Sequence, residues 1–226
     1  MLQIDIVSAV PDLLFSPLNH SIIRRAQSRD LLKINIIDLR SFGLGKNRQI
    51  DDYPYGGGSG MVLMIEPLYE CISKLKQEND YDAIVYLTPD GKIFDQKMAN
   101  NYSLFSHILI VCGHYKGIDQ RIRDHLITHE ISIGDFVISG GEPAAVIMVD
   151  AIGRLLPGVL NDETSALTDS FQDDMLAPPI YTRPEVFRGW KVPKILLSGH
   201  TKNIEDWRSQ KAEERTQKLR PDLLKE

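Results

Sequence analysis

The sequence predicts an α/β fold with a mostly parallel sheet, and two observations lead to that prediction. Short apolar runs typical of buried strands recur along the first 160 residues, and helical patterns fall between them. Strands that alternate with helices at this spacing usually pair in parallel, with the helices packed on the faces of the sheet. The chain has 226 residues, of which 42% are hydrophobic and 25% charged, enough for one large domain or for a medium domain with a small one.

The expected elements follow in order along the chain. The strands are Leu2–Ser8, Leu32–Leu39, Asp82–Leu87, His107–Cys112 and a pair within Glu130–Ser139. The helices are Asn19–Arg29, Glu66–Gln77, Asp95–Ser103, Ile118–Leu126, Pro143–Leu156 and, near the end, Ile204–Leu219 with a basic face. Pro143 suits a first helical turn, and Pro157-Gly158 ends that helix.

A domain boundary is expected near residue 161. The stretch from 161 to 181 contains five acidic residues and no basic one, which is typical of a solvated linker or lid. We therefore predict an α/β domain over 1–160, a linker or lid over 161–169 and a small helical domain over 170–226. Residues 1–182 carry 15 Lys+Arg against 24 Asp+Glu, whereas residues 183–220 carry 10 against 5. A basic tail on an acidic body indicates that one part binds a polyanion, although a solvated amphipathic helix would have a similar composition.

The sequence also indicates a cytoplasmic protein. Met1–Asp5 lacks the basic and then apolar pattern of a signal peptide and instead resembles a strand. The longest apolar run, Ala144–Val149, is too short to span a bilayer. Cys71 and Cys112 lie in apolar contexts without a partner at metal-binding spacing, so both are expected to be reduced core thiols.

Glycine-rich loops follow several of the expected strands. Gly113–Gly117 follows the expected strand His107–Cys112. Gly134 lies within the expected pair of strands in Glu130–Ser139, and Ser139–Gly141 lies at its end. Glycines at strand ends let backbone N–H and C=O groups approach a flat ligand closely. These loops match neither a dinucleotide-binding fingerprint nor a P-loop. They predict a nucleoside-like ligand held by main chain, and the loops Gly56–Gly60 and Thr88–Gly91 are candidates to join the same site.

Two ionisable residues flank the expected linker. Arg154 follows an almost wholly apolar helix, where a cation would also simply complement the helix C-terminus. Asp169 lies in Thr168-Asp169-Ser170, where it would serve equally well as a helix N-cap. Position alone leaves both the structural and the catalytic interpretation open for each residue.

Taken together, these segments resemble the bacterial tRNA (guanine-N1) methyltransferases of the TrmD family, in the knotted SPOUT class. The matching stretches are Asp51–Met61, Cys112–Arg121, Ser132–Glu142, Asp150–Leu160 and Tyr181–Val186, followed by Leu197-Ser-Gly199 and Trp207-Arg208. They occur in the family order and cover nearly the whole chain.

The resemblance implies that S-adenosylmethionine binds to the loops at one edge of the sheet. The residues that match the family's cofactor-binding positions are Tyr86, Leu87, Thr88, Pro89, Gly113, Tyr115, Ile133, Gly134, Asp135, Phe136, Val137, Ile138, Gly140 and Gly141. It also implies a C-terminal trefoil knot in the α/β domain and an obligate homodimer whose active sites are shared between the chains. Several residues depart from the family pattern. His114 replaces an arginine, Lys116 replaces a carboxylate, the proline at Pro143 is shifted by one place, and Glu205-Asp206 stand where the family is typically basic.

The resemblance further implies the chemistry. Methylation of guanine N1 must remove a proton, which needs a base and a group that stabilises negative charge on the guanine. Asp169 matches the family's general base and Arg154 the group that stabilises charge at O6, with magnesium as a further candidate. Candidate contacts to guanosine 37 and its tRNA are Gly58, Ser59, Ser165, Arg183, Lys191, Lys194, His200 and Arg208. Two alternatives stay open: a knotted methyltransferase with another RNA target, and a non-catalytic knotted RNA-binding dimer.

Overall fold

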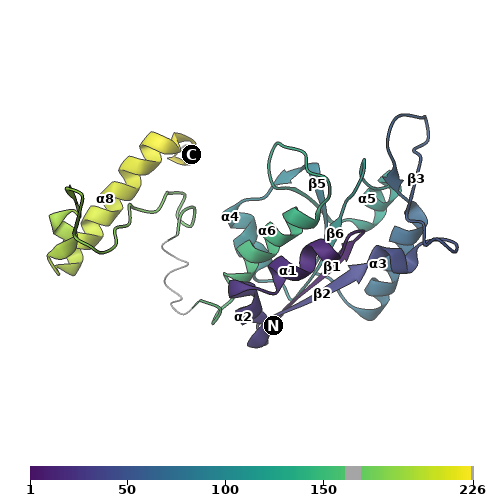
Figure 1. Ribbon diagram of the computed structural model, residues 1–226, viewed down its shortest axis with the longest axis horizontal. Helices are drawn as coiled ribbons and strands as arrows, with labels where there is room; N and C mark the ends of the chain where they lie inside the picture. The colour runs from purple at the N-terminus through teal and green to yellow at the C-terminus, as the bar shows by residue number, and fades with distance from the viewer. Residues whose placement is uncertain (161–168, 225–226) are drawn as a thin grey trace. The chain divides into compact units, whose positions relative to one another are not determined.

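The computed structural model describes residues 1–160 and 169–224 (Figure 1). The chain divides into two compact units, Met1–Asn161 and Asp162–Glu226. The first unit contains a parallel sheet with helices on both faces, and the second contains a short hairpin and a long helix. No helix within the described ranges is long and apolar enough to cross a membrane.

The central sheet of the first unit has five strands in the order β2-β1-β6-β5-β7, and all of its pairings are parallel. Its strands are β1 Leu2–Ser8, β2 Leu32–Asp38, β5 Ala83–Ile93, β6 His107–Cys112 and β7 His129–Ser132. Every residue of β6 is buried, which explains the apolar run Ile108–Cys112 that follows His107. The mostly parallel α/β fold is therefore confirmed, and the expected bounds of β1 and β6 are matched at both ends.

Helices cover both faces of this sheet (Figure 1). The first face carries α1 Asp12–Leu18, α2 Ser21–Ser28, α4 Gln96–Tyr102 and α6 Glu142–Gly153. The second carries α3 Ile65–Glu78 and α5 Gln120–Leu126, with the 3-10 turn η1 Leu39–Phe42 and the small ribbon of β3 Asp51–Asp52 and β4 Val62–Leu63. Two apolar cores result, one on each side of the sheet, and they hold the strand ends in fixed positions.

The structure differs from the sequence expectations for this unit in three places. Phe136–Ser139 is no strand, because its apolar side chains stand exposed beside a cavity, with Val137 at 86% exposure. Helix α1 was not foreseen, since Pro17 within it interrupts the helical pattern. The turn expected at Thr88–Gly91 is instead a bulge within β5, where Leu87 and Lys92 both pair with Ile131.

The second unit is built around α8 Thr201–Leu219, which confirms the helix expected over Ile204–Leu219 and begins three residues earlier. The unit also contains 3-10 turns, η2 Lys194–Leu197 and η3 Pro221–Leu224, and an unexpected hairpin of β8 Val186–Phe187 and β9 Trp190–Lys191. Thr216 of α8 is fully buried, and its hydroxyl accepts a hydrogen bond of 2.9 Å from the Leu176 N–H. This bond ties the segment before the hairpin to the helix.

Both cysteines are free and buried, as expected. Burial raises the pKa of the Cys71 thiol to about 12, and burial likewise raises the pKa of Cys112, with the nearby Glu142 acting in the same direction. A thiol with a raised pKa stays protonated at pH 8, and the thiolate is the reactive form. We expect a disulfide reagent at pH 8 to modify the folded protein about a thousandfold more slowly than the chain unfolded in denaturant. Rapid modification of either thiol in the native protein would contradict this expectation.

Candidate functional site

A cavity of about 680 Å³ lies at the carboxyl ends of β5, β6 and β7. Ligands of parallel α/β proteins bind at this edge because the loops that follow the strands converge there. Thirteen of the fourteen expected cofactor-binding residues line the cavity: Tyr86, Leu87, Thr88, Pro89, Gly113, Tyr115, Ile133, Gly134, Phe136, Val137, Ile138, Gly140 and Gly141. The described lining does not include Asp135. The structure thus brings together residues that are more than fifty positions apart in the sequence.

Main-chain contacts hold the loops around this cavity. The Gly141 N–H donates a hydrogen bond of 2.8 Å to the Gly113 carbonyl, and His114 and Gly140 form an isolated antiparallel bridge. On the other side of the Gly113–Gly117 loop, the Lys116 N–H donates to the Met61 carbonyl at 3.0 Å. The loop after β6 is therefore fixed between the segment that precedes α6 and the segment around β4.

The glycines at the contact between these loops have no room for a side chain. A Cβ on Gly141 would lie 2.8 Å from the Cys112 Cα and 3.0 Å from the Gly113 nitrogen. A Cβ on Gly113 would lie 3.0 Å from the ring of Tyr86, and one on Gly140 would lie 2.6 Å from Nδ1 of His114. Such close packing leaves main-chain groups at the cavity wall, as a flat nucleoside-like ligand requires. The cavity of about 680 Å³ therefore has the size of a small-molecule binding site, with main chain along part of its wall.

The Tyr86 ring forms a buried part of the cavity wall. Burial raises the pKa of its hydroxyl, so the phenol stays neutral near pH 7. The Arg123 guanidinium carbon lies 5.4 Å from the centre of the ring. Arg123 therefore packs against this wall as well as carrying charge.

Arg123 also joins three elements at the rim of the cavity. Its Nε and Nη2 donate to the two carboxylate oxygens of Glu130 at 2.7 Å each, and Nη2 also donates to Asp90 at 2.7 Å. Hydrogen bonds from Thr88 and Arg123 hold the pKa of the Asp90 carboxyl below its ordinary value. The arrangement holds the Thr88–Gly91 bulge in place, so that Thr88, Pro89 and Asp90 all line the cavity. Sequence reasoning missed both Asp90 and Arg123.

A second feature that was missed is the buried side chain of Glu142, in the first turn of α6. Its Oε1 accepts a hydrogen bond of 2.6 Å from the Ser8 hydroxyl at the end of β1. Within the described part of the chain, Oε2 has no hydrogen-bond partner, and neither has Nδ1 of His114. Both atoms flank the point where a Gly140 Cβ would stand. Burying polar atoms without hydrogen bonds costs free energy, so packing alone does not explain why these two atoms are buried here. The sequence signal was an acidic residue at the head of an otherwise apolar helix.

The Gly56–Gly60 loop reaches the cavity only at its end. Gly60 and Met61 line it, whereas Gly58 and Ser59 are exposed and are not among the described lining residues. Lys116 packs its aliphatic chain against Gly60, where a Cβ would meet the Lys116 Cγ at 3.0 Å. Lys116 is exposed, so its ammonium group can remain hydrated at the edge of the cavity.

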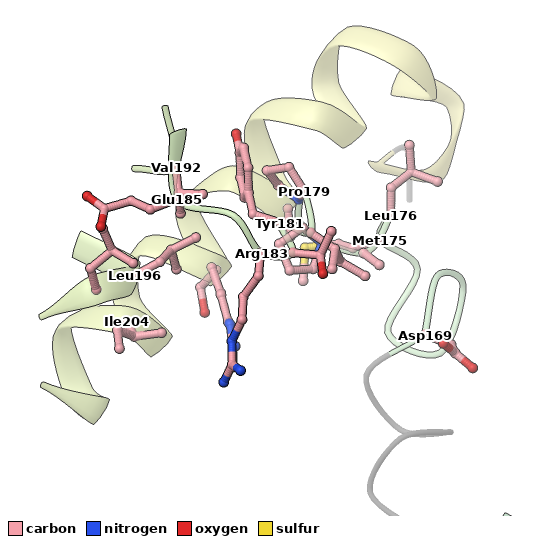
Figure 2. Close-up of a pocket in the computed structure, with 18 of the residues that line it drawn as sticks. Asp169, Met175, Leu176, Pro179, Tyr181, Arg183, Glu185, Val192, Leu196 and Ile204 are labelled. Carbon is pink, nitrogen blue, oxygen red and sulfur yellow. The ribbon is translucent and has the colours of Figure 1, made fainter. Parts of the chain in front are cut away.

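The two expected catalytic residues belong to different units. Arg154 caps the C-terminal end of α6 and is half-buried in the first unit. Asp169 is the first described residue of the second unit and lines a cavity of about 910 Å³ within that unit (Figure 2). Arg183 and Arg208, both expected to contact tRNA, line the same cavity, together with Tyr181 and several apolar side chains.

The remaining residues expected to contact tRNA lie in the second unit or outside the described residues. Lys191 is exposed on β9, Lys194 begins η2, and His200 immediately precedes α8. Ser165 lies outside the described residues. No group of three or more His, Cys, Asp or Glu residues that could hold a metal ion occurs within the described ranges.

A parallel α/β unit with a glycine-lined cavity at the carboxyl edge of its sheet belongs to a class of proteins that commonly bind ligands at this edge. The family model described as tRNA (Guanine-1)-methyltransferase TrmD matches residues 2–226. The chain therefore belongs to this family.

Relatives named tRNA (guanine-N(1)-)-methyltransferase are similar over nearly their whole length. The protein from Christiangramia forsetii is 57% identical over 223 residues, which cover 99% of each chain. That from Cytophaga hutchinsonii is 58% identical over 222 residues, covering 98% of this chain and 94% of the relative. That from Porphyromonas gingivalis is 56% identical over 225 residues, covering both chains fully. The match thus includes both units.

Proposed function

We propose that this protein transfers a methyl group from S-adenosylmethionine to N1 of guanosine 37, on the 3′ side of the tRNA anticodon, in the cytoplasm. The observation that carries the proposal is the cavity formed by three glycine-containing loops in a chain that belongs to this family throughout. Main-chain groups near Leu87, Gly113 and Gly141 would hold the cofactor, which supplies an activated methyl group on a sulfonium sulfur.

Two residues are proposed for the chemistry, one to remove a proton and one to stabilise negative charge. Asp169 accepts the proton that leaves guanine N1, and Arg154 stabilises the negative charge that develops on O6. An ordinary aspartate is a weak base for this proton, so acidification of the guanine by Arg154, with magnesium where it is bound, is the favoured route. Because Arg154 and Asp169 belong to different units, the proposed reaction draws on residues of both units, supplied by one chain or by two copies of it.

A homodimer and a trefoil knot complete the proposal. Leu13 and Phe15 on α1 and Ile147 on the neighbouring α6 are large apolar residues with about half of their surface exposed. Such a patch suits contact with a second copy of the chain, which would contribute to each active site. The knot would form where the chain from β7 to α6 passes the loop after β6, and the hydrogen bond from Gly141 to Gly113 supports a close passage there.

The second unit would bind the anticodon arm. Its cations would contact phosphates, while the exposed Gly58 and Ser59 would approach the extruded guanine. Ser165 is proposed to contact the same nucleotide.

Methyl transfer to defined RNAs tests this function. Purified protein is incubated with labelled cofactor and with tRNA transcripts that differ only in carrying guanosine or adenosine at position 37. We expect label only in the guanosine transcript, at N1 after nuclease digestion. Labelling of both transcripts or of another position would indicate a different RNA target. Binding of RNA without any labelling would favour a non-catalytic RNA-binding dimer.

A further inference from the structure

The β8–β9 hairpin of the second unit carries two exposed aromatic rings. Phe187 and Trp190 pair directly across the two strands and have exposures of 53% and 73%. Their ring centroids are 6.2 Å apart, with an angle of 55° between the planes. Two adjacent exposed rings form a small apolar patch, which is a candidate place for a partner to bind.

The hairpin holds these rings in a fixed arrangement. Its two-residue turn has positive φ at both positions, 51° at Arg188 and 83° at Gly189, as is typical of the tight turns that match the strand twist. The Val192 N–H donates a hydrogen bond of 2.9 Å to the Glu185 carbonyl, which extends the ladder beyond the two named strands. A platform that exists before binding loses little conformational freedom when a partner covers it.

The charge around the rings indicates the kind of partner. The Arg188 guanidinium carbon lies 5.5 Å from the centre of the Phe187 ring. Between residues 183 and 194 there are four basic residues and a single acidic one, Glu185. Exposed rings beside several cations suit a ligand that has both flat faces and phosphates, which describes an unpaired stretch of nucleic acid. A purely apolar protein surface would leave these cations without partners.

We propose that Phe187, Arg188 and Trp190 form a stacking platform for unpaired bases of the tRNA anticodon arm. The proposal rests on the proposed function and adds a contact site outside both cavities and outside the basic residues already assigned to tRNA binding. The rings stack on exposed bases, while Lys191 and Lys194 lie close enough in sequence to neutralise the neighbouring phosphates. Bases paired within a stem cannot offer their faces, so the platform selects the loop.

Fluorescence of Trp190 provides a direct test. The chain has two tryptophans, Trp190 and Trp207, so a Trp207→Phe variant of the full chain reports on Trp190 alone. This variant is titrated with an anticodon stem-loop RNA and with a fully paired duplex of the same length, at low and at moderate salt. We expect the stem-loop to quench Trp190 to the same final level at both salt concentrations, with a weaker affinity at moderate salt. We expect the duplex to bind without comparable quenching.

Substitutions measure how much the platform contributes. Trp190→Ala should weaken stem-loop binding about tenfold, whereas Trp190→Phe should retain most of the affinity, because stacking on one base contributes about 1–3 kcal/mol. Leu219→Ala removes another exposed apolar side chain of the same unit, at the end of α8, and should leave RNA affinity unchanged. Cofactor binding should be the same in all three variants.

Other outcomes would overturn the proposal. If the duplex quenched Trp190 fluorescence equally, the hairpin would contact phosphates and would not stack on unpaired bases. A change in oligomeric mass on Trp190→Ala, or a concentration-dependent change of Trp190 fluorescence without RNA, would assign the rings to a contact between copies of the chain. The proposed function fails separately, if the unmodified protein transfers no methyl group to tRNA.

Discussion

Replacing Asp169 with asparagine is expected to abolish methyl transfer while leaving both substrates bound. The substitution keeps the size of the side chain but removes the carboxylate that would accept the proton from guanine N1. A positioned general base contributes on the order of 100- to 10,000-fold to rate, so turnover should fall by about that factor. Single-turnover transfer of labelled methyl to tRNA measures the rate, and calorimetric titration with cofactor measures binding. The two readouts separate loss of chemistry from loss of folding.

Asp173 offers a matched control for this experiment. It lines the same cavity of the second unit as Asp169, and Asp173→Asn makes the same change of charge and shape. We expect Asp173→Asn to change turnover by no more than a few-fold. Near-normal turnover of Asp169→Asn would exclude Asp169 as the base. Equal loss in the two variants would point instead to the negative charge of the cavity as a whole.

The parallel sheet was predictable because its strands β1 and β6 are buried on both faces along almost their whole length. Ile108–Cys112 of β6 is an uninterrupted apolar run, and in β1 only Gln3 and Asp5 break the apolar pattern before Ser8. The same criterion failed at Phe136–Ser139, where an apolar run faces a cavity instead of a core. An apolar composition predicts that a segment is shielded from water. It does not predict whether the protein core or a bound ligand shields the segment.

Contacts that depend on strand order could not be predicted. Arg123 reaches Asp90, thirty-three positions away, because β5 and β7 are neighbours in the sheet although β6 lies between them in sequence. Ser8 and Glu142 meet for a similar reason, at 134 positions apart. The β8–β9 hairpin was missed because two-residue strands are too short to show an alternating pattern.

The glycine-rich loops could be found in the sequence because glycines at strand ends indicate tight turns and close main-chain contacts. The structure brings residues of these loops together around one cavity. The roles of these loops, of Arg154 and of Asp169 stay predictions. The basic composition of the tail pointed to a polyanion, but it singled out lysines and arginines and passed over the aromatic residues between them. Whether an aromatic ring is exposed depends on the folded hairpin, so composition alone does not predict it.

Replacing Gly141 with alanine is expected to remove the cofactor site by moving the main chain. The backbone of Gly141 is in an ordinary helical conformation, with φ of −76°, so strain in φ is not the reason. A Cβ would stand 2.8 Å from the Cys112 Cα and 3.0 Å from the Gly113 nitrogen, and neither atom can move without displacing the end of β6. The hydrogen bond between Gly141 and Gly113 would lengthen, and the two loops would separate. We expect cofactor affinity to fall at least a hundredfold and the free energy of unfolding to fall by about 1–3 kcal/mol, the usual cost of overpacking.

Gly153→Ala makes the same chemical change at the other end of α6 and so serves as its control. There a Cβ would meet only the ends of flexible side chains, the Ile23 Cδ1 at 2.8 Å and the Leu32 Cδ2 at 3.4 Å. Alanine also favours the helix by about 1 kcal/mol over glycine, which offsets the crowding. Titration calorimetry with cofactor should therefore show near-normal affinity for Gly153→Ala, and thermal unfolding should show a small change in stability. If Gly141→Ala bound cofactor as tightly as the unmodified protein, the close contact between the two loops would not be what shapes the cavity. If both variants lost affinity equally, the effect would come from α6 as a whole and not from the loop contact at its first turn.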